Sequence, residues 1–364
     1  MNTRDFTELL KGCRPVKDVD GNIIVQSIMN MQIVCLTTDA EYSLDTRFAN
    51  PLTALVSSNS SYGQMDLTNK ENKEVIVPTQ MAVITKQKAQ NHAMIKGGYI
   101  DKNKTVTYHD AGCVQGSETG HFRNSQEFRM IPVSMREMLF DNIGENGDYS
   151  RIYPAIEKLG KDTVSSTGNY LNKYFEKYDE KLEQFIAHFE RPKNLIGIIV
   201  LIDEEIVAID KFPSFSYAEQ VWDMMIRDCY GSLAIISEVK DKTSKQEFTD
   251  TYNNLKKSNR EHFLDLMEKA LKKTKENITL SVHEKVQELL EFTFDATLDS
   301  EGNSSTSRAK SYVLKNDGYV GQVITENEFN HLVSIVKKET FNPNAFREVN
   351  ELRRKARKQD KFSM

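Results

Sequence analysis

The stretch 90–122 gathers side chains that could do chemistry. Three of the seven histidines of the chain, His92, His109 and His121, fall in it, together with Cys113. Imidazole groups can transfer protons as general acids or bases, and a thiolate can act as a nucleophile. We therefore predict His109, His121 and Cys113 as catalytic candidates. No cysteine-hydrolase signature surrounds Cys113, so a small buried cysteine is the alternative.

The same stretch offers possible metal ligands, because imidazole and carboxylate groups such as that of Asp110 suit zinc, iron or manganese. No two of its histidines have the HxH or HxxxH spacing that is typical of ligand pairs. We therefore predict no metal site, and the sequence identifies no cofactor.

A polar loop that contains glycines occupies residues 115–121. Its backbone amides and hydroxyl groups could face a phosphate or a ribose. It lacks the lysine of a Walker loop and does not match the dinucleotide fingerprint, so an ordinary loop is the alternative. Asp210, at a predicted strand end, could bind a hydroxyl group or cap a turn. The predicted ligand-binding residues are Gln90, Asn91, His92, Gln115, Glu118, Asp210 and Trp222.

Antiparallel hairpins must hold these residues in place. Apolar runs that meet at short polar turns are typical of such hairpins, and Asn316-Asp317-Gly318 is a strong turn signal because glycine accepts positive φ angles. Residues 45–75 are rich in Asn, Ser and Gly and are predicted to form a loop. The predicted hairpins span 99–111, 196–212 and 311–324.

Helical patterns interrupt the strands. Between residues 171 and 189 apolar and aromatic residues recur at helical spacing, which predicts an amphipathic helix. Its aromatic stripe is expected to pack on the core of the protein, and a partner-docking face is the alternative. Ser216 to Glu219 reads as a capping box, which predicts a helix that carries Trp222 and packs on the preceding hairpin. A short helix is also predicted at 326–339.

The composition is typical of a globular protein. The 364 residues are 39% hydrophobic and 28% charged, with a net charge of −5. This charge argues against nucleic-acid binding, except through the basic segment after Pro343. The sequence lacks the roughly 20 consecutive apolar residues of a membrane helix, a secretory signal and any CxxC pair. We therefore expect a cytoplasmic protein with free thiols.

These elements predict an α+β fold with a mainly antiparallel sheet or sandwich at its core and helices packed on it. The predicted organisation is N-terminal strands and a loop at 1–75, an α+β core at 76–336 with helical insertions at about 155–190 and 240–290, and a basic tail at 337–364.

Three separated segments resemble one family, that of the proteins associated with ADP-ribosylglycohydrolase and rhodanese-phosphatase proteins. The resemblance covers roughly residues 77–322. Two positions depart from the family pattern, because His92 stands where members usually carry Arg, and Gln115 where they usually carry Glu. The matching segments are Gln90-Asn91-His92 with Gly112-Cys113-Val114-Gln115-Gly116, the stretch 196–214 with Trp222 and Tyr230, and the hairpin 311–324.

The resemblance implies a role in NAD and ADP-ribose metabolism or in nucleotide-based conflict systems, such as those between phage and host. The first hypothesis is a binding module for an ADP-ribose-like or signalling nucleotide. The second is a hydrolase of an ADP-ribosyl or phosphoryl bond, with His109 or His121 as the acid or base. The third is a protein that blocks a host or rival enzyme through its amphipathic helices.

Overall fold

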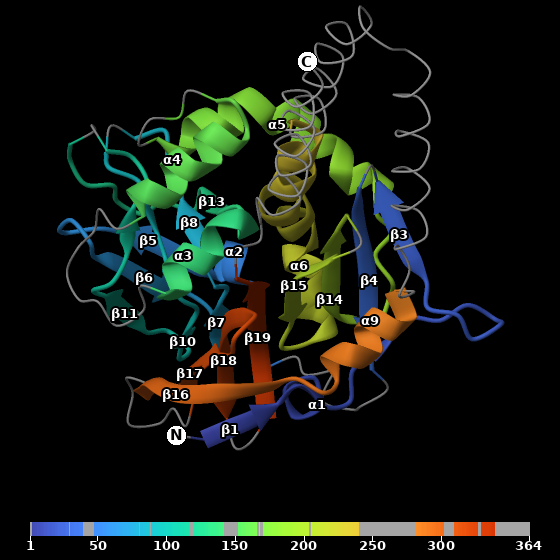
Figure 1. The fold of residues 1–364 in the computed structure, drawn as a ribbon. Helices are drawn as coiled ribbons and strands as arrows, with labels where there is room; N and C mark the ends of the chain where they lie inside the picture. Colours follow the sequence, from blue (N-terminus) through green and yellow to red (C-terminus); the bar gives the residue numbers. More distant parts are fainter. Residues whose placement is uncertain are drawn as a thin grey trace, which may run out of the picture.

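A ten-stranded antiparallel sheet and three smaller antiparallel sheets dominate the computed structural model (Figure 1). This architecture confirms the predicted α+β class. The predicted basic tail and most of the helical region 240–290 lie outside the described residues. The structure describes residues 2–338 apart from 29, 39–46, 80, 88, 117–118, 142–151, 166, 168–169, 204, 240–281, 302–308 and 327–328.

The large sheet draws its strands from both ends of the chain. The two predicted hairpins at 196–212 and 311–324 are confirmed and lie on either side of β19, which pairs with one strand of each. The strand order is β1 (Asn2–Asp5), β16 (Thr293–Glu301), β17 (Lys310–Lys315), β18 (Tyr319–Glu326), β19 (Phe329–Lys337), β15 (Glu205–Lys211), β14 (Leu195–Ile202), β4 (Met31–Thr37) and β2 (Arg14–Pro15), with β3 (Val25–Ile28) also paired to β4.

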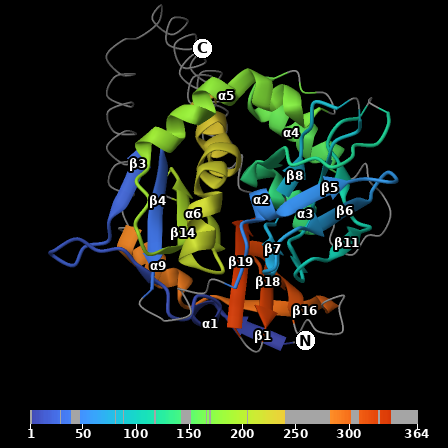
Figure 2. The same cartoon turned by 180° about the vertical axis from the view of Figure 1, so that it is seen from behind.

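The small sheets lie together beside β18 and β19, the strands in the middle of the large sheet (Figures 1 and 2). Gln322 of β18 fixes this junction, because its Oε1 accepts hydrogen bonds from Thr79 Oγ1 (3.2 Å) and Gly97 N (2.7 Å). The small sheets are β5 (Leu55–Ser58), β6 (Met65–Asn69) and β11 (Thr105–Tyr108); β7 (Val75–Val77) and β10 (Gly98–Ile100); and β12 (Gly112–Cys113), β9 (His92–Ala93), β8 (Met81–Val83) and β13 (Phe128–Met130).

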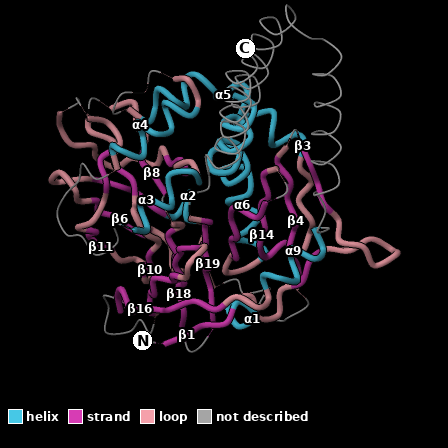
Figure 3. Tube along the Cα trace, in the orientation of Figure 1, coloured by secondary structure: helices cyan, strands magenta, loops and turns pink. Residues whose placement is uncertain are grey.

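Strand β14, LIGIIVLI, has no polar side chain because both faces of the large sheet are covered there. Every residue of β14 is buried. Side chains alternate across a strand, so Ile198 and Val200 join one hydrophobic cluster while Ile199 and Leu201 join another. Figure 3 shows helices near this sheet. The first cluster includes α5 (Leu171–His188) and α6 (Phe215–Met224), and the second includes α1 (Phe6–Leu9) and α9 (Val282–Leu289).

Helix α5 packs its aromatic stripe on the core, as predicted. Tyr174, Phe175 and Phe185 are buried on this face. The guanidinium of Arg129 lies 4.0 Å from the ring centroid of Phe175 and donates to Asp179 (2.8 Å), which fixes α5 against β13. None of the helices in the described ranges is long and apolar enough to cross a membrane.

Helix α6 carries Trp222 and packs on β14, as predicted. Its cap lies two residues earlier than the predicted capping box. Ser214 has extended backbone angles, and its Oγ accepts a hydrogen bond from Tyr217 N (3.2 Å). The prediction was wrong because Ser216 and Glu219 are already inside the helix, where they cannot satisfy its first free N–H groups. Other helices are α2 (Pro51–Ala54), α3 (Arg136–Asp141), α4 (Tyr153–Asp162), the 3-10 turn η2 (Val133–Met135) and the π-helical turn η3 (Met225–Tyr230), and residues 231–239 after η3 are also helical.

Three other local predictions are wrong. The segment 99–111 is not a hairpin, because β10 pairs with β7 and β11 pairs with β6. The segment 326–339 contains strand β19, which gains hydrogen bonds from neighbours on both sides. The segment 45–75 contains α2, β5 and β6; in β6 the apolar Met65 and Leu67 are buried, while Asp66 and Thr68 between them are only half-buried. For 99–111 and 326–339, a partner strand distant in sequence outweighs the local signal.

The buried stripe of α5 predicts a large effect of one truncation. Phe185→Ala should lower the free energy of unfolding by about 3–5 kcal/mol, because a buried ring leaves a cavity. Glu180→Ala, on the exposed face of α5, should change it by no more than about 0.5 kcal/mol. Denaturant unfolding measures both values, and equal small losses would contradict core packing of this stripe.

Candidate functional site

The loop at residues 59–64, between β5 and β6, brings two of the predicted catalytic histidines onto one face. The ring centroids of Tyr62 and His121 lie 5.6 Å apart. Gln64 Nε2 lies 3.0 Å from Nδ1 of His109. Both histidines are exposed, so their imidazoles can exchange protons with a bound molecule. We call this surface the 59–64 face.

His92 lies beneath the same loop and is fully buried. Its Nδ1 lies 2.9 Å from the Gln90 carbonyl oxygen, and its Nε2 lies 3.2 Å from Gly63 N. A carbonyl can only accept and an N–H can only donate, so Nδ1 carries the proton and Nε2 accepts. Burial lowers the pKa of His92 to about 4, against an ordinary value of 6.5. Both ring nitrogens of His92 are therefore engaged in hydrogen bonds with the backbone. The predicted contact of His92 with a ligand stays a prediction.

Cys113 is opposite His92 in the β9–β12 pair and is also fully buried. Its Sγ donates to the carbonyl oxygen of Gln115 (3.3 Å). Burial raises the pKa of the thiol and outweighs the opposing hydrogen bonds, including one with the Tyr153 side chain. The thiol is therefore held in its protonated form, which is the poorer nucleophile.

Three side-chain amides, of Asn59, Gln90 and Gln115, lie on neighbouring segments at this face, and we call them the amide cluster. Gln90 Nε2 donates to the Gln115 carbonyl oxygen (3.2 Å). Gln90 N donates to Gly120 O (3.3 Å), and Asn59 exchanges two hydrogen bonds with the backbone of Phe122. Oε1 of both glutamines and Nδ2 of Asn59 are buried and find no hydrogen-bond partner among the residues that the structure describes. Most buried polar atoms in proteins are paired.

Asn91 and Glu118 are the other two ligand-binding residues predicted in the stretch 90–122. Asn91 is buried, and its Oδ1 accepts a hydrogen bond from Thr85 N (3.0 Å), which holds Thr85 against Asn91. Glu118 lies outside the described residues. Within the ranges that are described, no group of three or more His, Cys, Asp or Glu residues is arranged to hold a metal ion.

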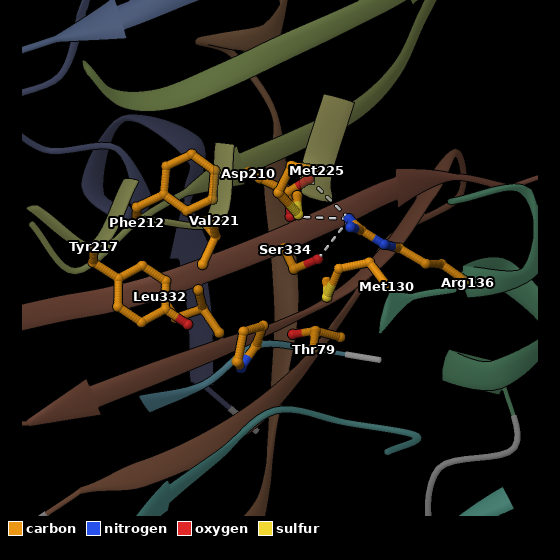
Figure 4. A pocket seen from close by; sticks show the side chains of 11 residues that line it. Thr79, Met130, Arg136, Asp210, Phe212, Tyr217, Val221, Met225, Leu332 and Ser334 are labelled. Atoms are coloured by element: carbon orange, nitrogen blue, oxygen red, sulfur yellow. Dashed lines mark hydrogen bonds and ion pairs between the residues drawn. The ribbon is translucent and has the colours of Figure 1, made fainter. Parts of the chain in front are cut away.

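Asp210 belongs to a separate, charged network (Figure 4). It lies near the end of β15 and is buried against Arg136, the first residue of α3. Arg136 Nη1 lies 2.9 Å from each carboxylate oxygen of Asp210 and 2.9 Å from Ser334 Oγ on β19. This arrangement pairs two buried charges and adds further hydrogen bonds to them, as a buried ion pair requires. Only Nε of the Arg136 guanidinium finds no partner among the residues that the structure describes.

The π-helical turn η3 completes the network. The Tyr230 hydroxyl donates to Asp210, and Arg136 Nη2 lies 2.8 Å from Cys229 Sγ. Burial raises the pKa of Cys229 to about 12, which the Arg136 charge only partly opposes. Wide π turns often occur where side chains must be redirected for function. Here the turn aims two consecutive side chains at one ion pair.

A cavity of about 10 Å³ lies beside Asp210 and is lined also by Thr79 and Ser334. This volume has room for about one water molecule. Trp222 is buried in the hydrophobic cluster of α6. The structure therefore does not bring Asp210 and Trp222 together with the predicted residues of the 59–64 face.

Sequence reasoning missed Asn59 and Tyr62. They lie in the segment that was predicted to be a loop without strands. The available signal was a tyrosine between two short alternating runs, LVSS and MDLTN, because loops held between strands often carry binding residues.

Comparison with protein families gives one match. The model of the ARG and Rhodanese-Phosphatase-superfamily-associated Protein domain, ARPP-1, matches residues 25–313. The chain belongs to this family. Searches of curated proteins and of solved structures found no match.

The ARPP-1 match includes the 59–64 face and, of the Asp210 network, Arg136, Asp210, Cys229 and Tyr230, whereas Ser334 lies beyond the matched residues. It confirms the resemblance that the segments around Gln90 and Asp210 indicated. Both departures from the expected pattern, His92 and Gln115, lie at the 59–64 face. With a neutral imidazole and a neutral amide at these positions, this ARPP-1 domain lacks the Arg and Glu charges that the resemblance leads one to expect there.

The buried ion pair predicts strong non-additivity. Arg136→Met should lower the free energy of unfolding by about 3–5 kcal/mol, because Asp210 then keeps an uncompensated buried charge. The double variant Arg136→Met/Asp210→Asn should lose clearly less than the sum of the two single variants. Arg191→Met removes the half-exposed pair with Glu219 and should cost less than about 1 kcal/mol. Additive losses in denaturant unfolding would show that the pair is not coupled.

His92 predicts a specific dependence of stability on pH. Its folded-state pKa lies below its ordinary value, so the unfolded chain takes up a proton first as the pH falls. The stabilisation is complete above pH 6.5 and is lost as the pH falls towards 4. From pH 7 to 5, the wild-type protein should lose about 2 kcal/mol more than His92→Gln. Denaturant unfolding at both pH values measures the difference, and parallel losses would mean that His92 is protonated in the folded state.

Proposed function

We propose that this ARPP-1 protein binds a nucleotide of the ADP-ribose or NAD class, or a related signalling nucleotide, at the 59–64 face. The observation that carries the proposal is the pair of Tyr62 and His121. Tyr62 is 43% exposed, and the two rings are tilted by 40°. Exposed aromatic rings on a fixed loop are typical platforms for nucleobase stacking, which contributes about 1–3 kcal/mol per base.

Two cationic residues lie on the segments that lead to this aromatic pair. Arg123 follows Phe122 directly, and its backbone N–H donates to Gln87 Oε1 (3.0 Å) while Gln87 Nε2 donates to Arg123 O (3.0 Å). The two hydrogen bonds hold the segments of Arg123 and Lys86 side by side. Both cations are exposed. Guanidinium and ammonium groups bind phosphate oxygens, so a diphosphate attached to a stacked base would find charge complements here.

The state of the buried groups supports binding in preference to nucleophilic catalysis. The Cys113 thiol is protonated and buried, and His92 is neutral with both nitrogens engaged. The exposed imidazoles of His109 and His121 are the groups that the alternative, a hydrolase of an ADP-ribosyl or phosphoryl bond, would use as acid and base. Product analysis after incubation with the same nucleotides separates the two functions.

Calorimetry with ADP-ribose, NAD and ADP should detect binding to the wild-type protein. Tyr62→Ala should weaken it roughly tenfold to a hundredfold, because one stacking platform is lost. Phe329→Ala, which removes an exposed ring on β19, should leave the affinity unchanged and serves as the matched control. Absence of binding to all three nucleotides by the folded wild-type protein would refute the proposed function.

A further inference from the structure

We infer that the amide cluster of Asn59, Gln90 and Gln115 binds a vicinal diol, that of the adenosine ribose of the nucleotide. The inference rests on the proposed function and specifies which chemical group of the ligand reaches deepest. It depends on three side chains that are each at least nine-tenths buried, with exposed fractions of 4%, 5% and 9% respectively. Each keeps one polar atom that no described residue pairs.

The identity of two of these free atoms follows from their partners. Gln90 donates to a carbonyl oxygen, that of Gln115, so the bonded atom must be its nitrogen and the free atom its oxygen. Asn59 accepts from the N–H of Phe122, so the bonded atom must be its oxygen and the free atom its nitrogen. Flipping either amide would place like groups against each other. The cluster therefore presents at least one acceptor and one donor, and Gln115 Oε1 adds a second acceptor.

This pattern selects a neutral hydroxyl-bearing group. A phosphate or carboxylate has no hydrogen to donate to the two amide oxygens, whose partial negative charges would repel it. The adjacent side chains add no positive charge to compensate, because His92 is neutral and Cys113 is a thiol. A vicinal diol both donates and accepts. It can give one hydrogen to each glutamine oxygen and accept from Asn59 Nδ2.

The arrangement also predicts which part of the ligand contacts which residues. The diol lies against the amide cluster, the base meets Tyr62 and His121, and the phosphates meet the exposed cations. Gln90 connects the buried amide cluster with the exposed aromatic pair, since its backbone N–H donates to Gly120 O (3.3 Å), next to His121. Burial of the cluster makes hydroxyl recognition selective, because a ligand without these hydroxyls leaves the amide groups unpaired.

The test compares ADP with 2′,3′-dideoxy-ADP by calorimetry on the full chain. Base and phosphates are the same in both, so only the hydroxyl contacts differ. ADP should bind roughly tenfold to a hundredfold more tightly, because 2′,3′-dideoxy-ADP loses the hydrogen bonds that both hydroxyls make to these buried groups. In Gln90→Leu this ratio should fall towards one, whereas Gln220→Leu, which changes a glutamine with an unpaired Oε1 on α6, should preserve it.

The outcomes separate this inference from the proposed function. Equal affinity of the wild-type protein for the two ligands overturns the diol assignment and leaves nucleotide binding intact, with the amide cluster holding only solvent. Binding of ADP-ribose without binding of ADP also overturns it, because the adenosine ribose would then not be the recognised group. No binding of any of these nucleotides overturns both proposals. The wild-type comparison decides the question even if Gln90→Leu fails to fold.

Discussion

The ion pair between Arg136 and Asp210 is the constraint on which the arrangement of this protein depends. Arg136 begins α3, just after the small sheets end at β13, and Asp210 lies on β15 in the large sheet. Two charges buried this deeply are tolerable only when they face each other and are bonded further. Ser334 on β19 and Tyr230 in the π-helical turn provide those further bonds. The pair therefore fixes the position of α3 against β15, β19 and this turn.

That charged interior contrasts with the 59–64 face, where the buried groups are neutral. His92 and Cys113 are held in uncharged forms by burial and by backbone hydrogen bonds. The amide cluster lies in the same surroundings. A neutral polar site under an exposed aromatic pair suits a ligand with a flat base and hydroxyl groups. The scaffold thus separates the charges that hold the layers together from the atoms that remain available for recognition.

The strands that are buried on both faces were the most predictable elements. The hairpin 196–212 combines long Val and Ile runs with a short polar turn, so its local pattern and its environment agree. The segments 99–111 and 326–339 were mispredicted because strands distant in sequence offered better pairing than the local pattern indicated. The loop that carries Asn59 and Tyr62 was missed for a different reason, because β5 and β6 are short and half polar and give only a weak strand pattern.

The sequence by itself determined the fold class, the aromatic stripe of α5 and the stretch in which His109 and His121 lie, because these depend on patterns within one segment. Only the tertiary structure decided which of these groups are available to a ligand. It placed His92 and Cys113 inside, left His121 beside Tyr62 at the surface, and engaged Asp210 with Arg136. The physical reason is that burial and hydrogen-bond partners, which set the charge and reactivity of each group, come from segments far apart along the chain.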